Sequence, residues 1–291
     1  GVVVQPRLEP ASLAGAAVAL HCTGSHLEAV LDQLLALVEA GLSVVSTCEE
    51  LAWPWYHHPE PARRLDQAAR QAGVTVLGTG VNPGFVMDLL PVVMTGVCTR
   101  VERVYVRRVV DASRRRAPLQ RKIGSGLDPE AFRRQVHEGR LGHVGLPESA
   151  ALVAAALRWR VDRIDVAVEP LVARRAIQTP YLSVLPGQVQ GLRQAAVAWE
   201  GGRERVRLEL IMALEPPALP DPPAGAGAGG FDQVRITGDP PLELVVPGGV
   251  FGDTATVAAV TNAIPRVIEA PPGLMSVKDL AVTAWWSGAP W

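Results

Sequence analysis

The chain has 291 residues, of which 48% are hydrophobic and 20% are charged, and its formal net charge is −1. This size and composition are typical of a globular protein of one large or two ordinary domains. The low charge gives no attraction to nucleic acid or to an anionic membrane surface, and no apolar run approaches the ~20 residues of a membrane span. The three cysteines are odd in number and lack metal-clip spacing, which predicts a reducing, cytoplasmic setting.

The first third of the chain alternates apolar strands with amphipathic helices. Ser25 is expected to cap the first helix and Gly41 to end it, and Pro61 is expected to start the second. The predicted order is strand 16–22, helix 26–40, strand 43–48, helix 61–70 and strand 74–80. Strands separated by crossover-length helices predict an α/β domain with a doubly wound parallel sheet.

From about Thr99 the pattern changes to long alternating strands. The predicted elements are strands at 100–110, 163–173, 189–200, 205–215 and 241–247, and helices near 129–138 and 148–159. Strands joined by short loops predict an α+β domain with an open antiparallel or mixed sheet. A late helix is expected from Asp253 to Ile264, ended by Pro265.

Two segments between these elements stand out by composition. Residues 215–230 are rich in proline, alanine and glycine, which predicts an exposed, mobile loop. The arginines Arg107-Arg108 and Arg114–Arg116 form the one local basic cluster. We interpret this cluster as a solvated loop, and the alternative is a site for an anionic group such as a cofactor phosphate.

Polar or glycine-rich turns follow the three predicted parallel strands, at HCTGSH, STCEE and GTGVNPGF. Because the carboxyl ends of such strands share one edge of the sheet, this pattern favours a common ligand site. Glu49 and Glu50 stand at the central strand end, and adjacent residues of an extended segment point opposite ways, so at most one is expected to face a ligand. A carboxylate beside the rings of Trp53, Trp55 and Tyr56 would suit a general base or an ammonium partner. The alternative is an ordinary acidic loop.

Other reactive side chains give weaker signals. A metal site at His57-His58 and a nucleophilic role for Cys48 are both disfavoured, because neither has a partner at a suitable spacing. His143 lies in a glycine-rich bend and is either a site residue or a turn-stabilising one. Asp253 is expected to cap the late helix, which carries Thr254, Thr256 and Asn262 and is expected to fold back over a cofactor.

Six longer segments carry a family resemblance. They are VVSTCEELAWPW, GTGVNPGFVMDLLP, PLQRKIGSGL, GHVGLPESAALVAAAL, PGQVQGLRQ and GGVFGDTATVAAVTNAIPRV. These segments resemble the 2,4-diaminopentanoate dehydrogenases, which group with native amine dehydrogenases among the dihydrodipicolinate-reductase-like enzymes. The resemblance implies a Rossmann-type domain for NAD or NADP at 1–98, a substrate and dimerisation domain at 99–250, and a tail at 251–291 that returns to the first domain. It also implies a homodimer that oxidatively deaminates an amine to a ketone and ammonia.

The resemblance further implies roles for particular residues. Glu49, with Glu50 as the alternative, would bind the amine and manage its proton. The aromatic residues Trp53, Trp55 and Tyr56, with His143, would form the substrate pocket. The residues expected to contact the cofactor are Thr23, Gly24, Thr47, Cys48, Asn82, Pro83, Asp253 and Thr254.

One feature of the resembling family is absent from its expected place. The sequence contains no opening strand followed by a G-x-G-x-x-G turn and a helix, and the first residues resemble the family after that unit. We therefore expect that the first βαβ unit is missing from this sequence. Two other hypotheses stay open at this point: a reductase of cyclic or conjugated imines, and a non-catalytic binding or scaffold protein without a cofactor site.

Overall fold

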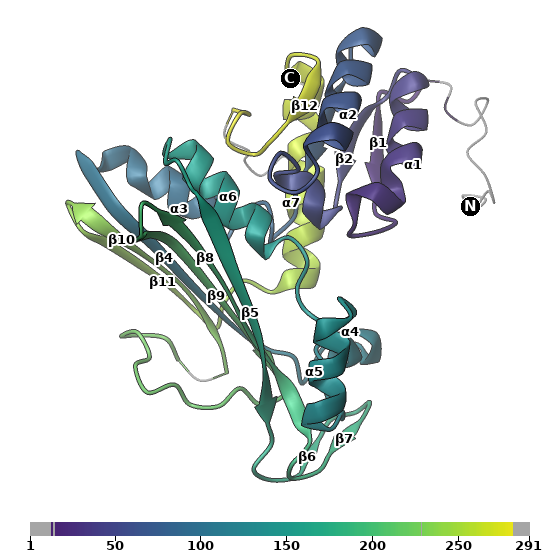
Figure 1. The fold of residues 1–291 in the computed structure, drawn as a ribbon. Coiled ribbons are helices and arrows are strands. Elements are labelled where there is room, and N and C mark those ends of the chain that lie inside the picture. The colour runs from purple at the N-terminus through teal and green to yellow at the C-terminus, as the bar shows by residue number, and fades with distance from the viewer. Residues whose placement is uncertain (1–12, 14, 228, 282–291) are drawn as a thin grey trace. The chain divides into compact units, whose positions relative to one another are not determined.

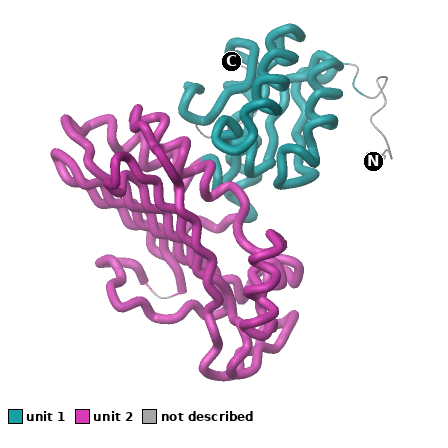
Figure 2. Tube along the Cα trace, in the orientation of Figure 1, with its two compact units in different colours: residues 1–84, 253–291 teal, residues 85–252 magenta. Residues whose placement is uncertain are grey.

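The computed structural model describes residues 13, 15–227 and 229–281. The chain forms two compact units (Figure 2): a first unit of residues 1–84 with 253–291, and a second unit of residues 85–252. Among the described residues, no helix has the length and apolar character needed to cross a membrane.

The first unit contains a four-stranded parallel sheet in the order β1-β2-β3-β12 (Figure 1). Its strands are β1 (Val18–His21), β2 (Ser43–Ser46), β3 (Thr75–Gly78) and β12 (Gly273–Met275). The expected alternation of parallel strands and helices is confirmed, whereas β12 was not predicted. Asp66 anchors β12, because its Oδ1 accepts a hydrogen bond of 2.8 Å from the backbone N–H of Leu274. The apolar run at 16–22 indicates a buried strand, but β1 lies at the edge of the sheet and its Leu20 is 48% exposed.

Helix α1 (Leu27–Glu39) buries every apolar position that its sequence pattern placed on one face. It ends before Gly41, whose φ of 77° is the left-handed conformation that glycine adopts without strain. The expected cap at Ser25 is wrong: the N-cap position is His26, and its side chain makes no capping hydrogen bond.

Two further helices of the first unit differ from expectation at one end. Helix α2 (Pro59–Ala72) begins two residues before Pro61. Helix α7 (Gly252–Glu269) contains Pro265 instead of ending there. A proline inside a helix removes one backbone hydrogen bond, and the burial of Val267 at 0% exposure in the continuing segment offsets part of that cost.

The second unit contains a six-stranded sheet in the order β11-β10-β4-β9-β8-β5. The pair β4–β9 is parallel and the other pairs are antiparallel, so the mixed sheet is confirmed. The strands are β4 (Arg100–Asp111), β5 (Arg163–Val172), β8 (Val189–Glu200), β9 (Arg203–Ala213), β10 (Phe231–Asp239) and β11 (Leu242–Pro247). A short hairpin, β6 (Ile177–Gln178) and β7 (Ser183–Val184), extends from one end.

Helices α3 (Leu89–Met94) and α6 (Leu146–Ala156) pack against one face of this sheet (Figure 1). Asp88 links the two helices, since it caps α3 through the N–H of Leu89 and accepts a hydrogen bond of 2.8 Å from Ser149 of α6. Helices α4 (Ala117–Lys122) and α5 (Pro129–His137) cover a second core, with Phe132 at its centre.

The basic cluster is not a single solvated loop. Arg108 is 4% exposed and pairs with Asp232 at 2.7 Å, and Arg107, on the opposite face of β4, pairs with Glu209 at 2.6 Å. The interpretation as a solvated loop is therefore wrong for these two residues. A sheet with a charged partner at the matching position of a neighbouring strand can bury an arginine without leaving it uncompensated. Arg114 and Arg116 are exposed, as expected.

The loop of residues 215–230 is exposed over most of its length, as its composition indicates. It is nevertheless anchored to the sheet, because Pro223 and Ala226 are buried and Asp221 forms an ion pair with Arg107 at 3.1 Å. Its mobility stays a prediction.

Candidate active site

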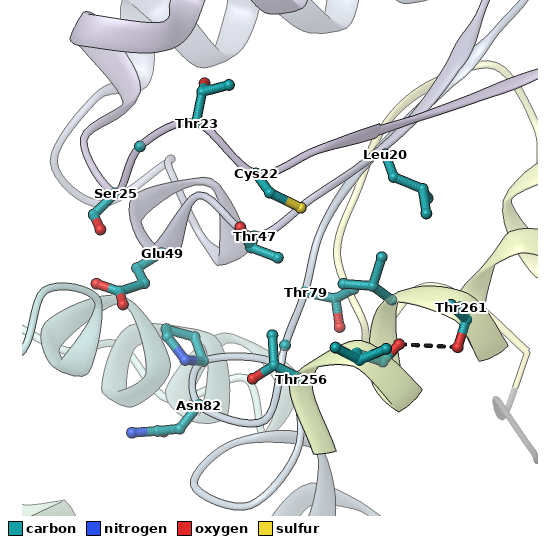
Figure 3. A pocket seen from close by; sticks show the side chains of 15 residues that line it. Leu20, Cys22, Thr23, Ser25, Thr47, Glu49, Thr79, Asn82, Thr256 and Thr261 are labelled. Atoms are coloured by element: carbon teal, nitrogen blue, oxygen red, sulfur yellow. Dashed lines mark hydrogen bonds between the residues drawn. The ribbon is translucent and has the colours of Figure 1, made fainter. Parts of the chain in front are cut away.

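A cavity of about 560 Å³ lies at the carboxyl ends of the parallel strands of the first unit (Figure 3). It is bordered by the turns after β1, β2 and β3 on one side and by α7 on the other. The lining consists of Leu20 from β1, Cys22, Thr23, Gly24 and Ser25 from the first turn, Thr47 and Glu49 from the second, Thr79, Gly80, Asn82 and Pro83 from the third, and Thr256, Val257, Val260 and Thr261 from α7.

Backbone pairing between the strands brings these turns together. The N–H of Thr47 donates to the carbonyl of His21 at 3.0 Å, and the N–H of Thr79 donates to the carbonyl of Ser46 at 2.9 Å. The hydrogen bonding between the parallel strands therefore continues one residue beyond β2 and β3. These bonds fix the positions of the three turns relative to one another.

Glu49 and Glu50 have different surroundings, so the structure separates their tasks. Glu49 lines the cavity. The Glu50 carboxylate instead accepts a hydrogen bond of 2.7 Å from the N–H of Leu27, at the start of α1. It also lies 2.9 Å from His26 Nδ1 and 3.0 Å from His58 Nε2. Glu50 thus supplies the cap that Ser25 was expected to give, and a carboxylate at this position also matches the positive end of the helix dipole.

The position of Glu49 depends on Gly78, the last residue of β3. Glu49 begins a short 3-10 helix, η2 (Glu49–Ala52), which packs directly on this strand end. A Cβ atom at Gly78 would lie 2.4 Å from the carbonyl carbon of Leu51, a distance that no side chain tolerates. The absence of a side chain at Gly78 therefore allows the glutamate-bearing turn to approach the sheet.

Helix α7 is attached to the turn after β3. The N–H of Val81 donates to Thr256 Oγ1 at 3.4 Å, so the hydroxyl fixes this part of the helix beside the cavity. The next turn of α7 presents Val257, Val260 and Thr261 to the same space. Asp253 and Thr254 precede these residues in the helix and are not part of the lining.

Cys48 lies behind the cavity wall rather than in it. It is 1% exposed, and burial, with smaller contributions from the charges of Glu50 and Glu49, raises its pKa to about 12. A thiol in this state is protonated at neutral pH, so it packs as an apolar side chain and is not a nucleophile. Cys22, which the sequence analysis did not single out, is the cavity's thiol.

The aromatic residues expected to wall the site do not line this cavity. Trp55 packs against the core formed by α1, α2 and the sheet. The Trp53 ring faces Lys278, whose Nζ lies 5.0 Å from the ring centroid, and the Tyr56 ring contacts His57 at a centroid distance of 4.3 Å. These rings contact residues of the chain itself, so their role in a substrate pocket stays a prediction.

His143 belongs to the second unit, in the bend before α6. Its backbone is held on both sides by the side chain of Gln194, which accepts from the His143 N–H at 2.6 Å and donates to the His143 carbonyl at 3.0 Å. This arrangement fits the turn-stabilising interpretation of the bend. Within the described part of the chain, no group of three or more His, Cys, Asp or Glu side chains is arranged to hold a metal ion.

The lining residues that sequence reasoning did not assign come from the strand ends and turns as well as from α7. Leu20, Cys22, Ser25, Thr79, Val257, Val260 and Thr261 line the cavity without having been assigned to it. The sequence contained a signal for the residues of the turns: Cys22 to Ser25 lie at the carboxyl end of a predicted strand, where ligands bind in parallel sheets. For α7 the sequence indicated that the helix folds over a cofactor, but it did not indicate which face lines the cavity, because valine, alanine and threonine alternate around the helix without a polar stripe.

The chemistry of the lining fits one part of a dinucleotide. Hydroxyl groups, glycines and the Asn82 side chain offer neutral donors and acceptors, and Glu49 is the one carboxylate. No lysine or arginine is among the lining residues, so the cavity suits the nicotinamide ring and its ribose rather than the anionic pyrophosphate. The sequence has the G-x-G-x-x-G spacing at 225–230, but this stretch belongs to the second unit and leads into strand β10, not into a helix.

Comparisons with known proteins agree with this chemistry. Residues 85–289 match the profile of the 2,4-diaminopentanoate dehydrogenase C-terminal domain. The chain is 36% identical over 267 residues to 2,4-diaminopentanoate dehydrogenase of Acetoanaerobium sticklandii, covering 91% of this chain and 74% of that protein. It is 25% identical to an amine dehydrogenase of Streptomyces virginiae, with 87% of this chain and 73% of that protein covered.

Solved structures show the same fold. Amine dehydrogenase from Mycobacterium smegmatis superposes with a TM-score of 0.77 at 24% identity, covering 92% of this chain and 77% of that one. The WlbA dehydrogenase from Thermus thermophilus, solved with NAD and UDP-GlcNAcA, gives a TM-score of 0.50 at 16% identity, covering 95% and 75% of the two chains. The parallel and mixed sheets therefore match those of Rossmann-like dehydrogenases.

Proposed function

The chain belongs to the 2,4-diaminopentanoate dehydrogenase family, and from that membership we propose that it performs NAD(P)-dependent oxidative deamination at the cavity of the first unit. The substrate is an amine on a secondary carbon, either 2,4-diaminopentanoate-like or a simple amine. The products are a ketone and ammonia, and the reaction is reversible.

The observation that carries this proposal is the position of Glu49. It is the one carboxylate among neutral lining residues, at the strand-end edge where doubly wound sheets bind ligands. A single negative charge in a lining without lysine or arginine favours a cationic ligand group. The ammonium group of an amine substrate has that charge, whereas a dicarboxylate imine does not.

A bound nicotinamide would supply the hydride acceptor, and the residues of the chain do the remaining work. Glu49 binds the ammonium group and takes its proton, which leaves the neutral amine whose carbon can give up hydride. The hydroxyls of Thr23, Thr47 and Thr256 offer hydrogen bonds to a ribose or carboxamide. Val257 and Val260 present apolar surface that reduces the access of water.

The overall reaction balances in atoms and charge. The ammonium form of the amine, NAD(P)⁺ and water give the ketone, ammonium ion, NAD(P)H and one proton. Loss of hydride leaves a carbon–nitrogen double bond, and water adds to that carbon before the C–N bond breaks. Glu49 is suitably placed to carry the protons that these steps release and consume.

The test is an absorbance assay of nicotinamide reduction with the full-length protein. A panel of amines is compared with dicarboxylate imines in the reverse direction, each with NAD and NADP. We expect activity with amines, and a loss of about 10²–10⁴-fold in kcat/KM for Glu49→Gln, a typical range for a residue that transfers protons. Glu60→Gln is the matched control, because Glu60 is an exposed acid on α2 of the same unit. Activity on dicarboxylate imines alone would support the reductase hypothesis instead.

We also propose a homodimer in a reducing, cytoplasmic compartment. All three cysteines are free, which fits such a compartment. The edge strand β5 exposes Val166 at 47% and Val172 at 42%, apolar surface that a second copy would cover. Light scattering of the purified protein tests the dimer directly, and a monomer at micromolar concentration would exclude it.

A further inference from the structure

We propose that His21 is a positioning residue, which sets the spacing between the turn that carries Thr23 and the turn that carries Glu49 and does so as a neutral imidazole with its proton on Nε2. The inference rests on the proposed function only for its kinetic readout. His21 is the last residue of β1, is 4% exposed and is not among the cavity-lining residues, so it acts through its neighbours.

Three segments of the first unit meet at this imidazole. Nδ1 lies 2.8 Å from Ser46 Oγ at the end of β2. Nε2 lies 2.8 Å from Thr23 Oγ1 in the turn after β1 and 3.3 Å from Gln33 Oε1 of α1. One buried ring therefore links the end of β2, the turn after β1 and helix α1.

The neighbouring hydrogen bonds decide the tautomer. Thr23 Oγ1 donates its proton to Gln33 Oε1 at 2.7 Å, so the threonine oxygen must accept from Nε2–H of His21. Nδ1 then carries a lone pair and accepts from the hydroxyl of Ser46. Ser46 Oγ in turn accepts from the backbone N–H of Cys48 at 3.0 Å. Every member of this chain has a partner in this one arrangement.

Both ends of the hydrogen-bond chain reach the cavity. Thr23 lines it directly, and Cys48 is the residue immediately before Glu49. Without the imidazole, the Thr23 hydroxyl and the backbone ahead of the Glu49 carboxylate would lose their common anchor. The structure thus assigns to His21 the mutual placement of Thr23, a lining residue of the cavity, and the proposed amine-binding acid.

Protonation of His21 would reverse the direction of its hydrogen bond with Ser46. The groups that face the ring are the neutral side chains of Ser46, Thr23 and Gln33, and burial lowers the pKa of His21 from its usual 6.5. A second ring proton on Nδ1 would leave the Ser46 hydroxyl without its acceptor. Because the unfolded chain then binds the proton more readily, His21 contributes stability above pH 6.5 that is lost as pH falls from 6.5 through its lowered folded pKa.

The first experiment observes the ring itself. Nitrogen-15 NMR of the labelled full-length protein at pH 7.5 is expected to show one histidine with a protonated Nε2 and an unprotonated Nδ1, and that signal is expected to disappear in His21→Gln. A His21 ring with its proton on Nδ1, or one that is charged at pH 7.5, would overturn the inference. This readout does not depend on substrate or activity.

The second experiment divides the hydrogen bonds between two variants. His21→Asn keeps an amide near the Nδ1 position and frees Thr23, so KM for the nicotinamide cofactor is expected to rise about fivefold with kcat little changed, as one lost hydrogen bond implies. His21→Gln keeps a donor near Nε2 and frees Ser46, so kcat is expected to fall about fivefold with KM for the cofactor nearly constant. A purely structural role would lower the amount of folded protein without producing this split.

His137→Asn and His137→Gln are the matched controls, since His137 is exposed at the end of α5 in the second unit. If the His21 and His137 variants behave alike in kinetics and in NADH binding measured by fluorescence, the positioning role is excluded. If the wild-type protein turns over none of the amines, the proposed function fails. The NMR tautomer and the NADH affinities of the four variants then still decide the role of His21.

Discussion

The Glu50 carboxylate accepts a hydrogen bond of 2.7 Å from the backbone N–H of Leu27, the first residue of α1. Its neighbour Glu49 lines the cavity. Two adjacent, chemically identical side chains thus have different surroundings: one holds a helix to a turn and the other lines the cavity. The separation can be tested by stability measurements as well as by activity.

Replacing Glu50 by alanine is expected to destabilise the first unit. The N–H of Leu27 and the imidazoles of His26 and His58 would lose their acceptor, a loss of about 1–3 kcal/mol for a partly buried charged cap. Urea unfolding followed by circular dichroism measures the change. Glu60→Ala, at an exposed position of α2, is the control and is expected to change stability by less than about 0.5 kcal/mol. Equal stabilities of the two variants would contradict the capping role.

Gly78→Ala is expected to displace the turn that bears Glu49. The new Cβ would lie 2.4 Å from the Leu51 carbonyl carbon, and backbone on both sides prevents simple relief. We expect a loss of roughly 1–3 kcal/mol, typical of overpacking, together with a fall in activity. Gly96→Ala is the control, because a Cβ there meets no atom within 4 Å. An active Gly78→Ala enzyme of unchanged stability would show that η2 does not need this close approach.

The buried pair Arg108–Asp232 is expected to respond asymmetrically to mutation. Asp232→Ala leaves a guanidinium at 4% exposure without its carboxylate and is expected to cost about 3–5 kcal/mol. The double variant Arg108→Met/Asp232→Ala removes both charges and is expected to be less destabilised than Asp232→Ala alone. Asp165→Ala, which breaks the exposed pair with Arg163 on strand β5 of the same sheet, serves as the control at about 0–1 kcal/mol. Additive effects of the two substitutions at the buried pair would argue against direct coupling.

Cys22 and Cys48 are expected to react with thiol reagents in a fixed order. Cys22 is exposed and is expected to react in the native state, whereas Cys48 is buried with its pKa raised to about 12. At pH 8 about one Cys48 thiol in 10⁴ is a thiolate, so its labelling should require unfolding. Mass spectrometry after brief iodoacetamide treatment, with and without urea, measures the order. Rapid native labelling of Cys48 would contradict its position behind the cavity wall.

Local sequence rules predicted much of the site, because those rules reflect geometry that every parallel sheet shares. The carboxyl ends of adjacent parallel strands must meet, so the three turns after them could be brought together from their places in the chain. The individual residues Thr23, Thr47 and Asn82, which line the cavity, came from the family resemblance. The expectation that either Glu49 or Glu50 would face a ligand came from the rule about strand ends. Which of the two it is depends on Leu27, a contact between segments that no local pattern encodes.

The missed elements have a different cause. Strand β10 carries Asp232 and Gln233 at 2% and 1% exposure, which hides the apolar alternation expected of a strand. Their partners are polar residues at matching positions of β4, Arg108 and Arg107. When both sides of a strand pair are polar, burial is invisible to a hydrophobicity pattern and is found only once the pairing is known. The aromatic residues near Trp53 do not line the cavity, because adjacency in the chain to a strand end does not decide where a ring points.

The strand order of the first unit has a consequence for synthesis on the ribosome. Thr75 of β3 pairs with Gly273 of β12, and the whole second unit, residues 85–252, lies between them in the chain. The second unit is translated as one uninterrupted segment and can fold while translation continues. The first unit must wait, with one side of β3 unpaired, until the segment that carries β12 emerges. Chaperone dependence of the nascent chain should therefore begin once β3 has left the exit tunnel and end when β12 does.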